Sequence, residues 1–199
     1  MKLVIQCLVI VLLLAIYAAA FVAVLRPHVT PEYRAFFINR TTVDYNPAHY
    51  DSKPEEGMVF SRPGVPQWVS GTHGFSMREE LGRWTDEDLG NSAGLTFTRE
   101  FTGDVCVDAS FRAIPWLVGD TITLRMGDQQ KQFQVRSADL TDYRLQLSAV
   151  QHGTSVDFIL PPKLPAVNER VHDSGDPRRL GISVVDLKLI PGECPVPSS

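Results

Sequence analysis

Alternating apolar and polar residues recur through the second half of the chain, and this pattern constrains the fold more than any other feature. In one such segment Val105, Val107, Ala109 and Phe111 are the apolar members. Comparable segments lie at 95–101, 121–126, 133–135, 143–147, 155–160 and 182–189. A period of two is typical of a half-buried strand. About seven such strands, separated by turn residues and not by helices, predict an all-β fold, an antiparallel β-sandwich or jelly roll.

The last of these segments changes phase. Ile182 and Val184 are followed by Val185, Leu187 and Leu189, so the apolar residues shift by one position within the segment. A single extra residue in one strand produces this shift, and we therefore predict a β-bulge there.

A long apolar run, Leu3 to Leu25, precedes the β pattern. It has 23 residues, of which only Gln6 is clearly polar. At about 1.5 Å per residue it spans roughly 35 Å, enough for a hydrocarbon core of about 30 Å. We predict an uncleaved transmembrane anchor over residues 1–26, with the remainder outside the cytoplasm. The alternative is a signal peptide cleaved near Ala20, after which the protein is secreted.

A connector follows the apolar run. Thr30 and Pro31 form a helix-start signal, which predicts a short helix to about Asn39. Its aromatic residues suit either the membrane surface or the folded domain; they are Tyr33, Phe36 and Phe37. The predicted organisation is an anchor over 1–26, a connector over 27–56, a β-sandwich domain over 57–191 and a tail over 192–199.

The charge of the chain argues against one class of partner. The formal net charge is -4, and the Lys and Arg residues form no cluster. Nucleic-acid binding usually requires a basic face, so we expect no nucleic-acid partner.

Two of the three cysteines lie in the part that we expect outside the cytoplasm, where oxidation permits pairing. Cys106 falls on the opposite face from Val105 and Val107, so it is positioned to meet Cys194 of the tail. This candidate disulfide closes a separation of 88 residues, for which the chain-entropy model gives about 4–5 kcal/mol. Two unpaired thiols remain the alternative, and we expect Cys7 to be an inert apolar residue of the anchor.

The segment 74–85 contains the residue types most suited to a site. Arg83 offers a planar fork of donors and Glu80 is a candidate acceptor, which predicts an ion pair at a corner of the β-domain. Catalysis by Glu79 and Glu80 as a pair is disfavoured, because adjacent residues of an extended segment point in opposite directions. We also expect Arg178 or Arg179 to tie a second charged corner to an acidic residue of this segment.

Two tryptophans are candidate platforms for sugar rings, since aromatic side chains suit the apolar faces of ligands. They are Trp84 and Trp116. For Trp84 a position in the core is the competing interpretation. The candidate ligand-binding residues are therefore Glu80, Arg83, Trp84, Trp116, Arg178 and Arg179.

The usual catalytic and metal-binding motifs are missing from the sequence. It has no Gly-x-Ser-x-Gly, His-Glu-x-x-His or Cys-x-x-Cys segment and no phosphate-binding glycine loop. The histidines are scattered at His28, His49, His73, His152 and His172. We expect no catalytic residue, no metal and no cofactor.

Several separated segments, in order, resemble one known family. They are Val59-Phe60-Ser61-Arg62-Pro63-Gly64-Val65-Pro66, Gly74-Phe75-Ser76 with Glu80, Gly82-Arg83-Trp84, Pro161-Pro162, and Asp176 with Arg178-Arg179-Leu180-Gly181-Ile182. Over about 57–190 the chain resembles the C-terminal β-domain of bacterial glucan phosphoglycerol transferases, which modify osmoregulated periplasmic glucans. In that family a separate sulfatase-like, metal-dependent domain carries the chemistry, and we expect no room for it here.

The resemblance implies a protein of the bacterial inner membrane whose β-domain lies in the periplasm. Its implied function is a non-catalytic accessory or glycan-binding module in the modification of periplasmic glucan or surface polysaccharide. The implied partners are the membrane, a glycan, and a membrane glycosyl- or phosphoglycerol transferase. Two alternatives remain open: a small transferase that acts on envelope glycans, and a scaffold of a membrane transferase complex.

Overall fold

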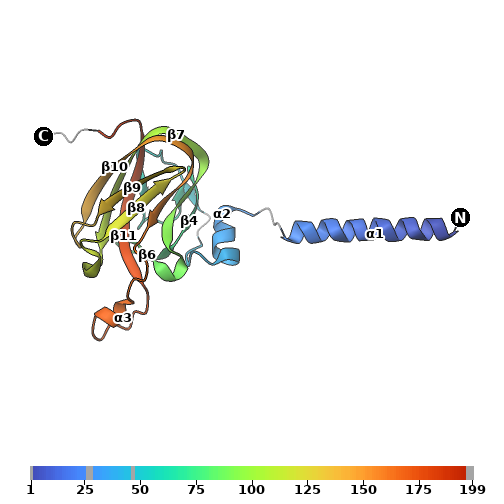
Figure 1. Ribbon diagram of the computed structural model, residues 1–199, viewed down its shortest axis with the longest axis horizontal. Helices are drawn as coiled ribbons and strands as arrows, with labels where there is room; N and C mark the ends of the chain where they lie inside the picture. The colour runs from blue at the N-terminus through green and yellow to red at the C-terminus, as the bar shows by residue number, and fades with distance from the viewer. Residues whose placement is uncertain (1, 26–28, 46–47, 196–199) are drawn as a thin grey trace.

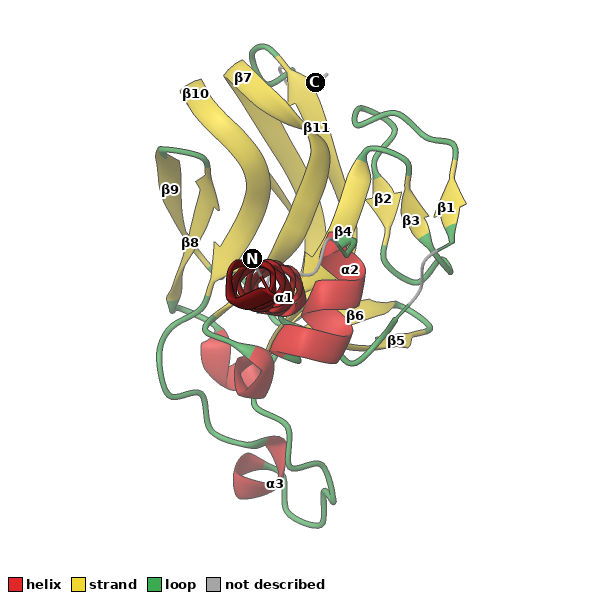
Figure 2. Ribbon diagram, turned by 90° about the vertical axis from the view of Figure 1, so that its right-hand side faces the viewer, coloured by secondary structure: helices red, strands yellow, loops and turns green. Residues whose placement is uncertain are grey.

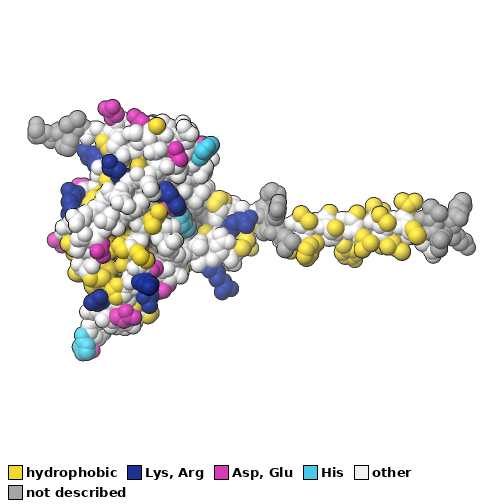
Figure 3. Space-filling model, viewed as in Figure 1, with side chains coloured by type: hydrophobic (Ala, Val, Ile, Leu, Met, Phe, Trp, Pro, Cys, Tyr) yellow, Lys and Arg dark blue, Asp and Glu magenta, His cyan; other side chains and the backbone are white. Residues whose placement is uncertain are grey.

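The computed structural model describes residues 2–25, 29–45 and 48–195. The N-terminal helix α1 (Lys2–Leu25) extends away from the β-domain (Figure 1). Hydrophobic side chains cover its surface (Figure 3), and none of the segment Ile5–Val24, whose mean hydropathy is 3.0, is buried. By length and composition this helix can cross a membrane, as the sequence predicts.

A short helical segment follows, divided between α2 (Pro31–Tyr33) and the π-helix η1 (Arg34–Asn39). The hydroxyl of Thr30 accepts a hydrogen bond of 3.2 Å from the backbone nitrogen of Tyr33. The predicted N-cap and the predicted end at Asn39 are therefore both correct.

This segment contacts the β-domain on one side and is exposed on the other. Ala35 is buried, whereas Tyr33 and Phe37 are 40% and 50% exposed. Their rings cluster with those of Phe36 and Tyr45, with centroids 4.6 to 6.4 Å apart. One side of the segment is therefore buried, while the aromatic rings of Tyr33 and Phe37 remain at the surface.

Part of the expected connector packs against the β-domain. Thr42 is only 5% exposed, and the carbonyl oxygen of Thr41 accepts a hydrogen bond from the backbone nitrogen of Gly74 at 2.6 Å. Further on, β1 (His49–Tyr50) pairs in parallel with β3 (Val65–Pro66). Residues 41–50, where they are described, therefore belong structurally with the strands that follow, whereas we expected them in a connector that precedes the β-domain.

Among the described residues, a sheet of nine strands makes up most of the β-domain, beside the two-stranded sheet of β1 and β3. Its strands are β2 (Met58–Val59), β4 (Val69–His73), β5 (Phe75–Glu79), β6 (Gly82–Asp86), β7 (Ser92–Ala113), β8 (Thr121–Met126), β9 (Gln129–Gln134), β10 (Thr141–Ile159) and β11 (Leu180–Pro191). Short helices interrupt the connections at η2 (Glu87–Leu89), η3 (Pro115–Leu117) and α3 (Val167–Arg170).

The strand order is β5-β6-β11-β7-β10-β8-β9, with β2 added beside β11 and β4 beside β7. All pairs in this sheet are antiparallel. The strands β7 and β10 are long and curved (Figure 2), and their pairing shifts register three times between Leu147 and Ser155. Because bulges bend strands, the two ends of the sheet face each other as a β-sandwich. The predicted all-β, antiparallel class is confirmed.

The core lies between the two ends of the sheet. The ring of Phe111 stacks on Tyr143 at 4.3 Å, and it also contacts Phe133 and Phe158 at 5.8 and 6.4 Å. The four apolar residues of the alternating segment 105–111 are at most 2% exposed. Their predicted inward orientation is correct.

The predicted bulge lies in β11. The pairing of β11 with β7 shifts register between Val184 and Asp186, which leaves Val185 as the extra residue. On either side Ile182, Val184 and Leu187 are fully buried. The phase change in the sequence is therefore the mark of this bulge.

Candidate functional site

Trp84 lies on the β5–β6 hairpin, half-buried against the core with its polar edge at the surface. Its indole Nε1 donates a hydrogen bond of 3.2 Å to Oε2 of Glu79. The other oxygen of the same carboxylate accepts from Nη1 of Arg178 at 3.2 Å. The carboxylate therefore joins the hairpin to a corner that is 99 residues away in the sequence.

Arg178 is itself held by a second carboxylate. Its Nε and Nη2 donate to Asp176 at 2.9 and 2.7 Å. These bonds raise the pKa of Arg178 and lower that of Asp176. Both groups remain ionised at neutral pH, and a bidentate pair fixes the plane of the guanidinium.

The surface around this network is partly apolar. Met77 and Leu81, on the same hairpin, are 65% and 49% exposed. An aromatic ring beside carboxylate and guanidinium groups suits a ligand that has both an apolar face and polar groups, because the ring offers an apolar contact and the charged groups offer hydrogen bonds. We call Trp84, Glu79, Arg178 and Asp176 the hairpin surface.

Arg83 and Glu80 do not form the predicted ion pair. Glu80 is exposed in the turn between β5 and β6, whereas Arg83 is 5% exposed and points to the other face of the hairpin. The Arg83 guanidinium donates to the carbonyl oxygen of Ser76 and to the hydroxyl groups of Thr72 and Thr42, at 3.1, 3.2 and 3.5 Å. The prediction paired Arg83 with Glu80 because the two residues are close in the sequence. It was wrong because the side chains of β6 alternate between two faces, and that of Arg83 points inward.

The remaining candidates lie apart from the hairpin surface. Arg179 donates to the carbonyl oxygen of Leu164 at 2.7 Å and pairs with Asp88 at 3.5 Å. Trp116 lies in η3, packed against the core, and its buried Nε1 has no hydrogen-bond partner within the described part of the chain. Of the predicted site residues, the structure thus brings Trp84 and Arg178 together, through Glu79.

A polar network that the sequence did not reveal surrounds Asp157 of β10. Its carboxylate, 7% exposed, is 2.9 Å from Nε2 of His73 and 3.4 Å from Nη2 of Arg125, and it accepts from the hydroxyl of Ser155 at 3.0 Å. Burial raises the pKa of Asp157, but these partners outweigh burial and hold the pKa below its ordinary value. Because His73 and Asp157 are 84 residues apart, no local pattern links them.

Metal ligands were not expected, and the described residues contain no cluster of three or more His, Cys, Asp and Glu side chains suited to a metal ion. His28 lies outside the described residues. The histidines at positions 49, 152 and 172 do not join the hairpin surface; His152 and His172 face Glu100 and Asp173 instead.

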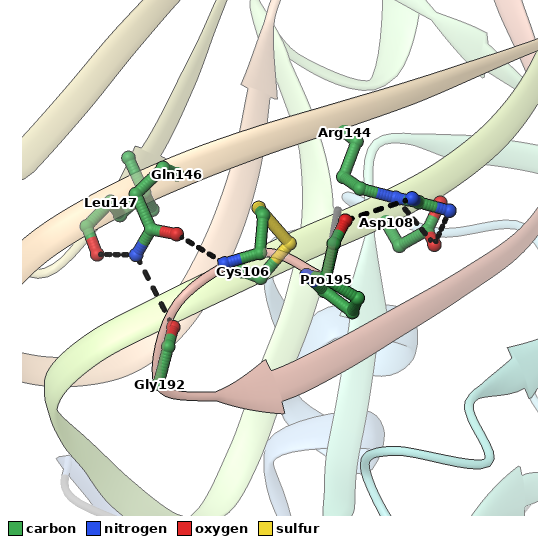
Figure 4. Close-up of a disulfide and its surroundings, with 8 residues drawn as sticks. Cys106, Asp108, Arg144, Gln146, Leu147, Gly192 and Pro195 are labelled. Carbon is green, nitrogen blue, oxygen red and sulfur yellow. Dashed lines mark hydrogen bonds and ion pairs between the residues drawn. A yellow bond between two sulfur atoms is a disulfide. The ribbon is translucent and has the colours of Figure 1, made fainter. Parts of the chain in front are cut away.

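Cys106 and Cys194 form a disulfide with a Cα–Cα distance of 4.8 Å. Next to it, the backbone nitrogen of Cys194 donates to Oε1 of Gln146 at 2.7 Å, and Nη1 of Arg144 donates to the carbonyl oxygen of Pro195 at 3.2 Å (Figure 4). The described part of the tail is therefore held across the outer face of β7 and β10.

Comparison with known proteins places most of the chain in one family. The chain is 25% identical over 138 residues to "Phosphoglycerol transferase I" of Escherichia fergusonii, and 24% identical over 138 residues to the protein of that name in Citrobacter koseri. Each match covers 69% of this chain, which spans 18% of the length of these relatives.

Two solved structures show a distant similarity. One is described as "BiXyn10A CBM1 APO", with 10% identity and a TM-score of 0.40 over 69% of this chain and 98% of that one. The other is a mutant of a carbohydrate binding module family 29, with 10% identity and a TM-score of 0.41 over 67% and 90%. Residues 42–191 match the family model described as "Domain of unknown function (DUF7024)", a range that begins within the expected connector. Because this match covers most of the chain, the protein belongs to the DUF7024 family.

Proposed function

We propose that this protein is a single-pass protein of a bacterial inner membrane whose periplasmic β-domain binds a glycan. It acts as a non-catalytic accessory in the modification of periplasmic glucan or surface polysaccharide. The observation that carries the proposal is the hairpin surface, where Trp84, Glu79 and Arg178 combine an aromatic ring with fixed polar groups. The similarity to Phosphoglycerol transferase I supports the connection to glycan modification.

Two observations support the proposed location. The helix α1 has the length and composition of a membrane span, and the disulfide between Cys106 and Cys194 suits an oxidising compartment such as the periplasm. Cleavage near Ala20 would release the same β-domain from the membrane. A membrane-bound form also brings the domain close to a membrane glycosyl- or phosphoglycerol transferase, the partner that we propose.

The test is a titration of the full-length protein in detergent with glucose oligosaccharides, with and without phosphoglycerol substituents, followed by tryptophan fluorescence and calorimetry. We expect saturable binding that Glu79→Gln weakens about tenfold, because the substitution removes a charged acceptor that both orients Trp84 and binds hydroxyl groups. Glu80→Gln is the matched control, since Glu80 is the neighbouring carboxylate and is exposed in the turn.

Trp84→Ala should abolish the fluorescence change and weaken binding further, and its thermal melt shows whether the fold survives. The proposal is wrong if neither form of the oligosaccharide binds, or if Glu79→Gln and Glu80→Gln weaken binding equally. If Glu79→Gln weakens oligosaccharide binding and Glu80→Gln does not, the hairpin surface recognises the oligosaccharide. Nonspecific attraction to acidic side chains would make the two variants alike.

A further inference from the structure

The face of the hairpin opposite Trp84 contains an unusual concentration of positive charge. Arg78 of β5 and Arg83 of β6 are paired directly across the two strands. Like charges at directly opposed positions destabilise a sheet. Burial lowers the pKa of Arg83, and the charge of Arg78 adds to that effect. Water would screen the repulsion between two exposed arginines. Arg83 is only 5% exposed, so water screens its repulsion with Arg78 less.

Within the described residues, Arg83 has no carboxylate among its hydrogen-bond partners. It donates to neutral oxygens of Ser76, Thr72 and Thr42. A guanidinium has five N–H groups, so three hydrogen bonds leave donor capacity on this side chain. Burial, opposed by the charge of Asp44, lowers the pKa of Arg83 to about 10, so the group is still a cation at neutral pH. A buried cation with only neutral partners is costly unless an anion accompanies it.

A small cavity lies beside this guanidinium. Its volume is about 10 Å³, room for one water-sized group. Arg62, Arg78 and Arg83 line it, and Asp44 is the one carboxylate among the described residues of the lining. Positive charges around the cavity therefore exceed negative ones by two.

The other two arginines are positioned at its rim. The guanidinium of Arg62 lies over the ring of Tyr50, 3.8 Å from the centroid, which fixes its position. Arg78 is 32% exposed, and its Nη1 is 4.0 Å from Asp44, too long for a hydrogen bond. Both side chains thus retain donors that can meet a group entering from solvent.

We propose that this cavity is a binding site for a phosphate group, with one oxygen inserted beside Arg83 and the others bound at the rim by Arg62 and Arg78. Arginine forks match tetrahedral oxyanions, and a doubly charged phosphate balances the excess charge. The site is independent of the proposed glycan function, because adjacent residues of a strand project to opposite faces and Trp84 lies on the other one.

The test is calorimetry and thermal melting of the full-length protein in detergent, titrated with inorganic phosphate at constant ionic strength set by sodium chloride. We expect saturable binding and a rise in melting temperature. Arg78→Gln and Arg62→Gln should each weaken phosphate binding about tenfold or more. Arg99→Gln is the control, because Arg99 is an exposed arginine of β7 that does not line the cavity.

If Arg83 has only a structural role and binds no phosphate, we expect a different result. If the three arginines only repel one another, Arg78→Gln raises the melting temperature and phosphate has no effect on any form. If a bound phosphate offsets that repulsion, Arg78→Gln melts at the same or a higher temperature without phosphate and loses the rise that phosphate gives the natural protein. The proposal is overturned by the absence of saturable binding, or by equal weakening in Arg78→Gln and Arg99→Gln.

Discussion

Removal of the disulfide should destabilise the β-domain by an amount that the loop length sets. Cys106 and Cys194 are separated by 88 residues, a segment that contains β8, β9, β10 and β11. For that separation the chain-entropy model gives about 4.6 kcal/mol at 25 °C, because the cross-link restricts the unfolded chain. In a domain of about 150 residues this corresponds to a fall in melting temperature of roughly 9–18 °C.

The perturbation is the double variant Cys106→Ala and Cys194→Ala. Alanine is preferable to serine at position 106, because Cys106 is fully buried and a serine hydroxyl would lack a partner there. The hydrogen bonds from Cys194 to Gln146 and from Arg144 to Pro195 remain possible after the substitution, so the variant tests the cross-link and not the loss of the tail.

The assay is denaturant unfolding of the full-length protein in detergent micelles, with thermal melting followed by circular dichroism. Cys7→Ala is the matched control, since Cys7 is an exposed, unpaired cysteine of α1. The reasoning is refuted if the double variant unfolds within about 1 kcal/mol of the Cys7→Ala protein, or if reductant leaves the melting temperature of the natural protein unchanged.

Two further predictions concern Val156 and Asp157 of β10, which lie beside Gly94 of β7 and His73 of β4. The lowered pKa of Asp157 means that its ionised form stabilises the folded state above the ordinary carboxyl pKa of about 4, and that this contribution is lost as pH falls through the folded pKa. Asp157→Asn should therefore cost about 1.5–3 kcal/mol at pH 7, by loss of the charged partner of His73, and the difference from the natural protein should shrink in unfolding curves measured below about pH 4. Gly94→Ala should cost about 3 kcal/mol or more, because the added Cβ would lie 2.1 Å from the carbonyl oxygen of Val156 and the strands must separate. Gly175→Ala, whose Cβ meets nothing within 4 Å, should unfold like the natural protein in the same denaturant series, and equal losses at both glycines would contradict the steric argument.

The strands were predictable because burial repeats along them with a fixed period. Phe111 and Leu187 are buried where alternation places them, and the phase change at Val185 marks the bulge. The packing of residues 41–44 was not predictable by the same means. Thr41 and Thr42 contact the domain through a carbonyl oxygen and a hydroxyl, so a polar sequence conceals a buried segment.

The sequence predicted part of the hairpin surface, and the part that was wrong concerns its acidic residue. Trp84 and Arg178 were identified as site residues, and Arg178 contacts an acidic residue of segment 74–85 as predicted, namely Glu79. Glu80, the acidic residue that we named for the site, does not join them, whereas Glu79 contacts both. A register shift between Phe75 and Arg78 changes which side chains of β5 share a face. The strand β5 is too short for its alternation of apolar and polar residues to show where the register shifts.

The position of Arg83 next to Trp84 decides how the two proposals must be separated. Both side chains belong to β6, so a substitution in that strand disturbs the glycan surface on one face and the phosphate cavity on the other. The informative substitutions are those in partners that other segments supply. Arg178 reaches only the first face, from the corner before β11, and Arg62 reaches only the second, from the turn after β2. Loss of glycan binding in Arg178→Gln with phosphate binding retained, and the reverse in Arg62→Gln, would establish two sites; parallel losses would mean that one site uses both faces.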